Sequence, residues 1–78
     1  MNLRRAMLIA SNYIIFGDPN GEIGSFDPLG GEYMEETDTW RIICQYKKNG
    51  IERKATVVID NKTEEILSFK VIEESRSG

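Results

Sequence analysis

The 78-residue sequence contains no histidine and a single cysteine, Cys44, and both scarcities restrict the chemistry it can support. One cysteine cannot form an internal disulfide, and a structural zinc site needs several cysteine or histidine ligands. Without a histidine, Cys44 has no imidazole to activate it as a nucleophile. We therefore expect no catalytic activity, no metal and no cofactor.

Basic residues are also scarce in the first half of the chain. Residues 1–16 carry two arginines and no acid, residues 17–38 carry seven acids and no base, and residues 39–78 carry eight bases and six acids. A phosphate backbone would be repelled by the acidic segment, and no cluster of lysine or arginine is dense enough to offset this repulsion. Nucleic-acid binding is therefore not expected.

No apolar run is long enough to span a membrane, so no membrane association is predicted. The first residues, MNLRRAMLIASNYIIF, begin as an export signal does, with two arginines before an apolar stretch. Ser11 and Asn12 interrupt that stretch, and Asp18-Pro19 follows where a signal would have a small-residue cleavage site. Together with the single cysteine, this favours a cytoplasmic protein.

The apolar residues of the first 16 positions recur at helical spacing. The main stripe consists of Leu3, Met7, Ala10 and Ile14. With its apolar neighbours, this stripe is wide enough to cover one face of a sheet. Asn2 can cap the helix at its start, and Pro19 cannot continue it. The sequence therefore predicts an N-terminal helix over residues 1–16.

From residue 39 onward, apolar and polar residues alternate as they do in β-strands. Asn49-Gly50 is the strongest short hairpin signal, because both residues tolerate the positive φ of a type I′ turn. With this turn, Ile42 pairs with Val57, and the other inward pairs of the two strands are apolar as well. Register and hydrophobic pattern therefore agree on one hairpin.

The third strand is placed by the same argument. Pairing Ile59 with Leu67 keeps the inner face apolar, whereas a shift of one residue would turn Ser68 inward. This register leaves residues 62–64 as a three-residue loop, which requires one residue with left-handed backbone, usually a glycine. The left-handed position falls on Glu64.

These elements predict a single-domain α+β fold over residues 1–78, with the helix packed on a three-stranded antiparallel β-meander. The predicted segments are a helix at 1–16, an acidic loop segment at 17–38, a β-meander at 39–73 and a tail at 74–78. The strands of the meander are expected at 39–48, 51–60 and 65–73, with a possible short fourth strand from residues 20–36. The face expected under the helix bears Trp40, Ile42, Cys44, Ala55, Val57, Ile59, Leu67, Phe69 and Val71.

The stretch VVIDNKTEEILSF at residues 57–69 resembles the closing hairpin of PepSY-type domains. In that family the run reads roughly V-x-V-D-x-x-T-G-E-I-L, and its cystatin-like fold also combines a helix with an antiparallel meander. The resemblance extends from Trp40 to about Val71, and Glu64 stands where the family has its glycine. It implies a non-catalytic binding module and assigns no functional residue, because the matching positions are turn and core residues.

The acidic segment contains one pattern that could bind a metal, DPNGEIGSFD at residues 18–27. Gly21 can be aligned with the invariant glycine of a calcium-binding loop, and Asp18, Asn20 and Asp27 then fall at ligand positions. Phe16 would occupy the first ligand position, where it cannot bind a cation, and the last position lacks the longer glutamate. A polar loop without metal is favoured, and calcium binding is the lesser alternative.

The sheet face turned away from the helix is not uniformly polar, and it holds the candidate binding residues. These are Arg41, Ile43, Val58, Ile66, Lys70 and Ile72. We expect Ile43 and Val58 at the centre, with Arg41 and Lys70 at the rim. Aliphatic residues bordered by basic ones suit a protein partner, although such residues can also be singly exposed or covered by the acidic segment.

The function expected from the sequence is a small non-catalytic module. It binds an unknown protein or peptide, or a second copy of itself, through the outer sheet face. One alternative is a structural or regulatory subunit that docks its acidic segment 17–38 on a basic partner. The other is a small-molecule or calcium binder that uses the same segment.

Overall fold

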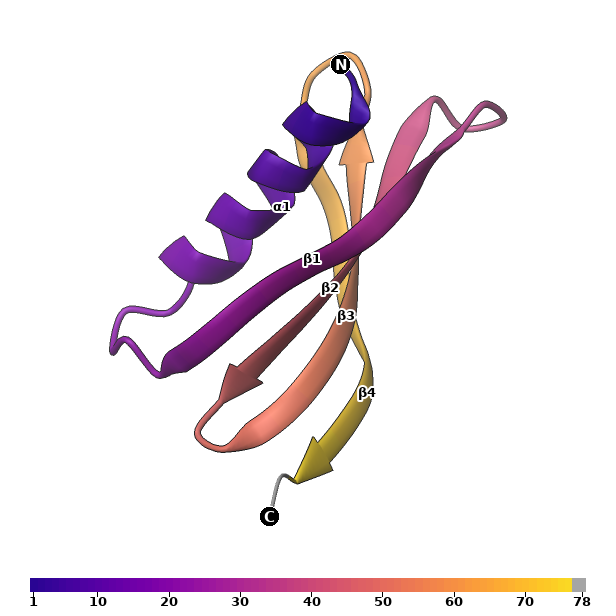
Figure 1. Cartoon of the computed structure of the whole chain (residues 1–78). Coiled ribbons are helices and arrows are strands. Elements are labelled where there is room, and N and C mark those ends of the chain that lie inside the picture. Colours follow the sequence, from indigo (N-terminus) through magenta and orange to yellow (C-terminus); the bar gives the residue numbers. More distant parts are fainter. Residues whose placement is uncertain (77–78) are drawn as a thin grey trace.

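In the computed structural model, which describes residues 1–76, one helix packs across one face of a four-stranded antiparallel sheet (Figure 1). The elements are α1 (Leu3–Phe16), β1 (Ile23–Met34), β2 (Thr39–Lys48), β3 (Ile51–Asp60) and β4 (Ile66–Arg76). The strands lie in the order β1-β2-β3-β4, so each pairs with its neighbour in sequence. The α+β class is confirmed.

The helix forms where its spacing and cap predict it. Oδ1 of Asn2 accepts the backbone N–H of Arg5 at 2.9 Å and so satisfies one of the free donors of the first turn. Ala6, Ala10 and Ile14 lie four residues apart on one side of the helix and are buried against the sheet.

No helix within residues 1–76 is long and apolar enough to cross a membrane.

The hairpin of β2 and β3 has the predicted bounds and the predicted register. Ile42 pairs with Val57, and the strands end at the turn that Asn49 and Gly50 form. These two residues have φ angles of 53° and 76°, as a type I′ turn requires. Local turn chemistry and the alternation of the two strands therefore specify the same structure.

The acidic segment folds differently from the prediction. Instead of a loop with at most a short strand, residues 23–34 form the 12-residue strand β1, which pairs with β2 from end to end. Its register shifts between Ile23 and Ser25 and again between Pro28 and Gly30, and each shift interrupts the alternation of its side chains. Pro28 is tolerated because β1 is an edge strand.

The last strand follows the predicted register except near its start. Val57 pairs with Phe69 as expected, but Ile59 faces Ile66 and not Leu67. A bulge absorbs the extra residue, so Leu67 is 53% exposed and not part of the covered face. Ile66, which was expected to point outward, packs against the core.

The predicted tail at residues 74–78 is also partly wrong. β4 continues to Arg76, and Glu74 pairs with Arg53 of β3. Residues 77–78 lie outside the described part of the chain.

The core lies between α1 and the strands β1 to β3, which are the strands that the helix contacts most. Its buried members are Ala6, Ala10, Ile14, Ile42, Cys44, Tyr46, Ala55, Val57 and Ile59. β4 is less well covered, so Phe69 remains 37% exposed, although its ring meets that of Tyr13 at a centroid distance of 5.7 Å. The opposite face of the sheet takes no part in this core.

Candidate functional site

The outer face, defined as the side of the sheet opposite α1, is not covered by any element of residues 1–76 (Figure 1). The sequence left open whether the acidic segment would cover this face. It does not, because most of the segment is β1, which extends the sheet at its edge. The four-stranded sheet therefore offers one open side.

Strand register places four of the six predicted binding residues on the outer face. Arg41 of β2 pairs with Val58 of β3, and Ile43 lies in the same row as Thr56 and Lys70. Ile43 and Val58 are half-buried, and Arg41 and Lys70 are exposed. Ile43 and Val58 therefore lie diagonally across β2 and β3, with Arg41 beside Val58 and Lys70 on the edge strand β4.

The two isoleucines of β4 are placed differently from these four. Ile66 does not lie on the outer face, because the bulge at Leu67 turns it towards Ile59 and the core. Ile72 lies at a second bulge, between the pairs Ala55–Val71 and Lys54–Glu73, and is 50% exposed. A bulge changes which face the following residues occupy, and alternation alone could not predict it.

A shallow hollow lies on the outer face over β1 and β2. It is lined by Leu29, Gly30, Gly31, Glu32, Arg41, Ile43 and Lys54. The hollow is open at Gly30, which lies opposite Ile43 and carries no side chain, while the adjoining bulge leaves Leu29 about half exposed. Sequence reasoning missed Leu29, and the Gly30-Gly31 pair was the signal that could have indicated it.

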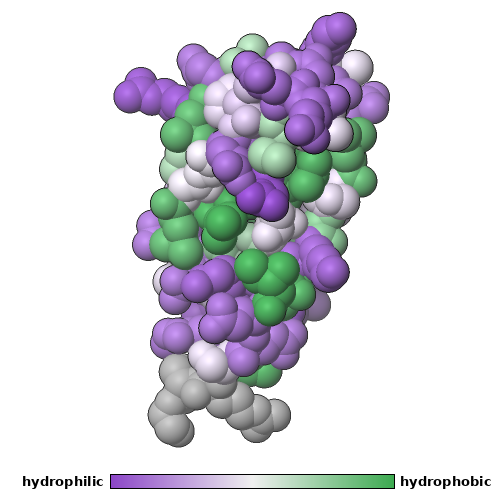
Figure 2. Space-filling view, turned by 90° about the vertical axis from the view of Figure 1, so that its right-hand side faces the viewer, coloured by the Kyte–Doolittle hydropathy of each residue, from purple (hydrophilic) through white to green (hydrophobic). Residues whose placement is uncertain are grey.

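Ion pairs border the aliphatic centre. Arg41 pairs with Glu32 of β1, and Nζ of Lys54 lies 3.5 Å from Oε2 of Glu73 on β4. Such exposed pairs each stabilise a fold by only about 0–1 kcal/mol, but they hold charged groups of both signs at the border of the patch. Figure 2 shows the result, with hydrophobic side chains in the middle of the face separated by hydrophilic ones.

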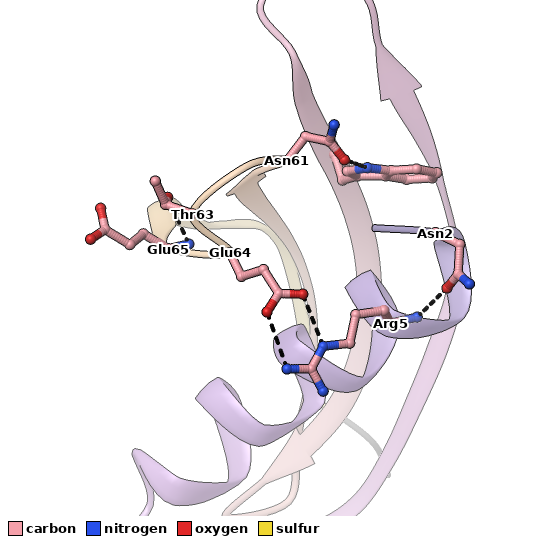
Figure 3. Close-up of polar contacts among 7 residues, drawn as sticks. Asn2, Arg5, Asn61, Thr63, Glu64 and Glu65 are labelled. Atoms are coloured by element: carbon pink, nitrogen blue, oxygen red, sulfur yellow. Dashed lines mark hydrogen bonds and ion pairs between the residues drawn. The ribbon is translucent and has the colours of Figure 1, made fainter.

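A polar network lies at one end of the sheet and explains Trp40. Its indole Nε1 donates to Oδ1 of Asn61 at 2.8 Å (Figure 3), and Nδ2 of Asn61 donates to Oδ1 of Asp38 at 3.0 Å. The hydroxyl of Tyr33 donates to the same Asp38 oxygen at 2.6 Å. This network joins the β1–β2 turn to the β3–β4 loop, so the tryptophan has a structural role.

The β3–β4 loop is also bound to the helix. Arg5 donates from Nε and Nη2 to the two carboxylate oxygens of Glu64 at 3.0 and 3.2 Å (Figure 3). This hydrogen-bonded ion pair lowers the pKa of Glu64. Glu64 has a φ of 63°, so the predicted left-handed position is confirmed.

The two aspartates of the calcium alternative have separate places in the structure. Oδ2 of Asp18 accepts the backbone N–H of Ile23 at 2.7 Å, and Asp27 lies in β1 opposite Gln45. Within residues 1–76, no three side chains of histidine, cysteine, aspartate or glutamate are gathered as a group that could hold a metal ion.

Cys44 is buried in the core, and burial raises the pKa of its thiol to about 11. The thiol is therefore protonated at neutral pH and is not an activated nucleophile. The chain matches no protein-family model, no curated protein and no solved structure.

Proposed function

We propose that this chain is a small, non-catalytic interaction module that binds another protein through the outer face of its sheet. The observation that carries the proposal is the open face itself, with half-buried Ile43 and Val58 in its middle and exposed Leu29 beside them. Burial of apolar surface stabilises a complex by roughly 25 cal/mol per Å². On this face, that stabilisation is available only to a partner.

Two further observations support this function over the alternatives. The resemblance of residues 57–69 to the closing hairpin of PepSY-type domains implies a non-catalytic binding module. The acidic segment, which the alternatives use as a docking or ligand loop, is mainly the paired strand β1. A cytoplasmic location stays a prediction.

The test is a comparison of two variants in pull-downs from a lysate of the source cells. Val58→Glu places a charge in the middle of the outer face, and we expect it to abolish capture of the proteins that the wild-type chain retains. Leu8→Glu makes the same kind of change on the exposed side of α1, where Leu8 is 49% exposed, and should leave capture unchanged. If Val58→Glu folds normally by circular dichroism and captures the same partners, the outer face is not the binding surface.

A further inference from the structure

We infer that the outer face binds a second copy of this chain, related to the first by a two-fold axis that runs along the strands. This inference rests on the proposed function and adds the identity and the arrangement of the partner. It is carried by two charged side chains, Asp27 and Lys70.

Asp27 and Lys70 lie at opposite edges of the outer face, and neither charged side chain has a partner within residues 1–76. Asp27 lies on β1 and Lys70 on β4, and both are exposed. Neither side chain forms an ion pair or hydrogen bond within residues 1–76, whereas Arg41 and Lys54 are each paired with a neighbouring glutamate. The face therefore has an unpaired negative charge at one edge and an unpaired positive charge at the other.

A two-fold rotation about an axis along the strands brings these charges together. It lays β1 of one copy over β4 of the second copy, and β2 over β3, because it reverses the strand order across the face. Asp27 of each copy then faces the edge that carries Lys70 of the other. A two-fold axis across the strands would instead lay β1 over β1 and bring acidic edges together, so charge complementarity favours the first arrangement.

The spacing along the strands is compatible with this pairing. Asp27 is in the row of Gln45 and Lys54, whereas Lys70 is in the next outward row, with Ile43 and Thr56. Adjacent rows on one face are two residues apart, roughly 7 Å. A lysine side chain, together with the crossing of about 30° between stacked sheets, can close most of this distance.

The same rotation also covers the apolar part of the face. The hollow beside Leu29 and Ile43 comes to lie against β3 and β4 of the second copy, where Val58 supplies an apolar side chain. Specific interfaces bury about 800 Å² on each partner, which is about one sixth of the 5158 Å² surface of this chain. One side of a molecule whose longer extents are 40 and 22 Å can supply this area.

Sedimentation equilibrium of the purified chain at low salt tests the inference. We expect a dimer whose dissociation constant rises about tenfold or more for Asp27→Lys and for Lys70→Asp, because each change sets like charges against each other. An equal mixture of the two variants should regain the wild-type affinity as a heterodimer, since each contact then joins a lysine to an aspartate. Glu36→Lys, the same charge change in the β1–β2 turn, should alter the constant by no more than about twofold.

Three outcomes would overturn the inference. A wild-type chain that stays monomeric up to its solubility limit has no second copy on this face. A dimer that neither variant weakens, or that the mixture does not restore, is assembled in another way. In each of these cases the pull-down of Val58→Glu against Leu8→Glu still decides the proposed function independently, because it uses partners from the lysate.

Discussion

Gly31 lies at a position where the sheet leaves no room for a side chain. A Cβ at this position would lie 2.4 Å from Cδ1 of Ile42 and 2.7 Å from the backbone oxygen of Arg41. The isoleucine could move, but the carbonyl belongs to a paired strand and cannot shift without distorting the sheet. The close approach of β1 to β2 at the hollow therefore depends on this glycine.

We predict that Gly31→Ala lowers the free energy of unfolding by about 1–3 kcal/mol, the usual cost of overpacking. The measurement is urea denaturation followed by circular dichroism. Gly24→Ala is the matched control, because a Cβ there meets nothing within 4 Å. Equal denaturation midpoints for the two variants would contradict the close approach of β1 to β2.

Glu64 combines a backbone conformation that favours glycine with an ion pair that favours glutamate. Its φ of 63° costs a non-glycine residue roughly 1 kcal/mol, whereas its exposed ion pair with Arg5 acts in the opposite direction and stabilises the glutamate. The sequence predicts that Glu64→Gly raises stability by up to about 1 kcal/mol. Because Glu64→Gly also removes the ion pair, the expected gain is smaller than this.

A double-mutant cycle separates these two contributions. In an Arg5→Gln background the ion pair is already lost, so Glu64→Gly should be more favourable than in the wild type. Both differences are read from denaturation midpoints. If Glu64→Gly changed the stability by the same amount in both backgrounds, the ion pair would contribute nothing.

The carboxylates of Asp60, at the end of β3, and of Glu64, in the β3–β4 loop, make the stability depend on pH in the acidic range. Backbone N–H groups of Thr63 and Lys62 donate to Asp60 at 2.8 Å and lower its pKa, and Arg5 lowers that of Glu64. Because both folded-state pKa values lie below the unfolded ones, this contribution is complete above the unfolded pKa of about 4 and disappears as the pH falls through the folded values.

We therefore predict that Asp60→Asn, which keeps an oxygen acceptor but cannot titrate, flattens the acid side of the stability profile. The measurement is urea denaturation at a series of pH values from neutral to about 2. An unaltered slope for Asp60→Asn would show that the loop carboxylate is not perturbed.

At the scale of elements, Asn61 joins the two hairpin ends through Trp40 and Asp38. Asn61→Ala leaves the half-buried indole N–H without its acceptor, and we expect a loss of about 1–3 kcal/mol of stability. Lys62→Ala, next in the same loop, removes only an exposed pair at 3.9 Å and should cost less than about 0.5 kcal/mol.

Fluorescence reports on this network directly, because Trp40 is the only tryptophan in the chain. Asn61→Ala should shift its emission, whereas Lys62→Ala should not. An unchanged spectrum and an unchanged midpoint for Asn61→Ala would show that the network does not hold the two ends of the sheet together.

The elements differ in how well the sequence predicted them. The helix and the β2–β3 hairpin were predictable because a cap, a helical stripe and an Asn-Gly turn are all local signals. β1 was not, because two register shifts and a proline interrupt its alternation within 12 residues. Among the site residues, Arg41, Ile43, Val58 and Lys70 follow from the undisturbed register, whereas Ile66 and Leu29 depend on bulges.

At the scale of the whole molecule, the proposed pairing of two copies should weaken with added salt. The Asp27–Lys70 contacts lie at the rim of the face, where ions screen them, and the Debye length falls from about 10 Å at 0.1 M salt to about 3 Å at 1 M. We expect the dissociation constant of the dimer to rise several-fold over this range by sedimentation. A constant that falls with salt would indicate an interface held by apolar contacts alone.

The sequence by itself determined the helix, the β2–β3 hairpin and the left-handed backbone of Glu64, because each depends on residues close together in the chain. Only the tertiary structure decided that the acidic segment pairs as β1, that Ile66 turns inward, and that Asp27 and Lys70 lack partners at opposite edges of one face. The physical reason is that bulges and ion pairs depend on segments distant in sequence. A bulge of one residue reverses the faces of the residues beyond it, and no local pattern contains that information.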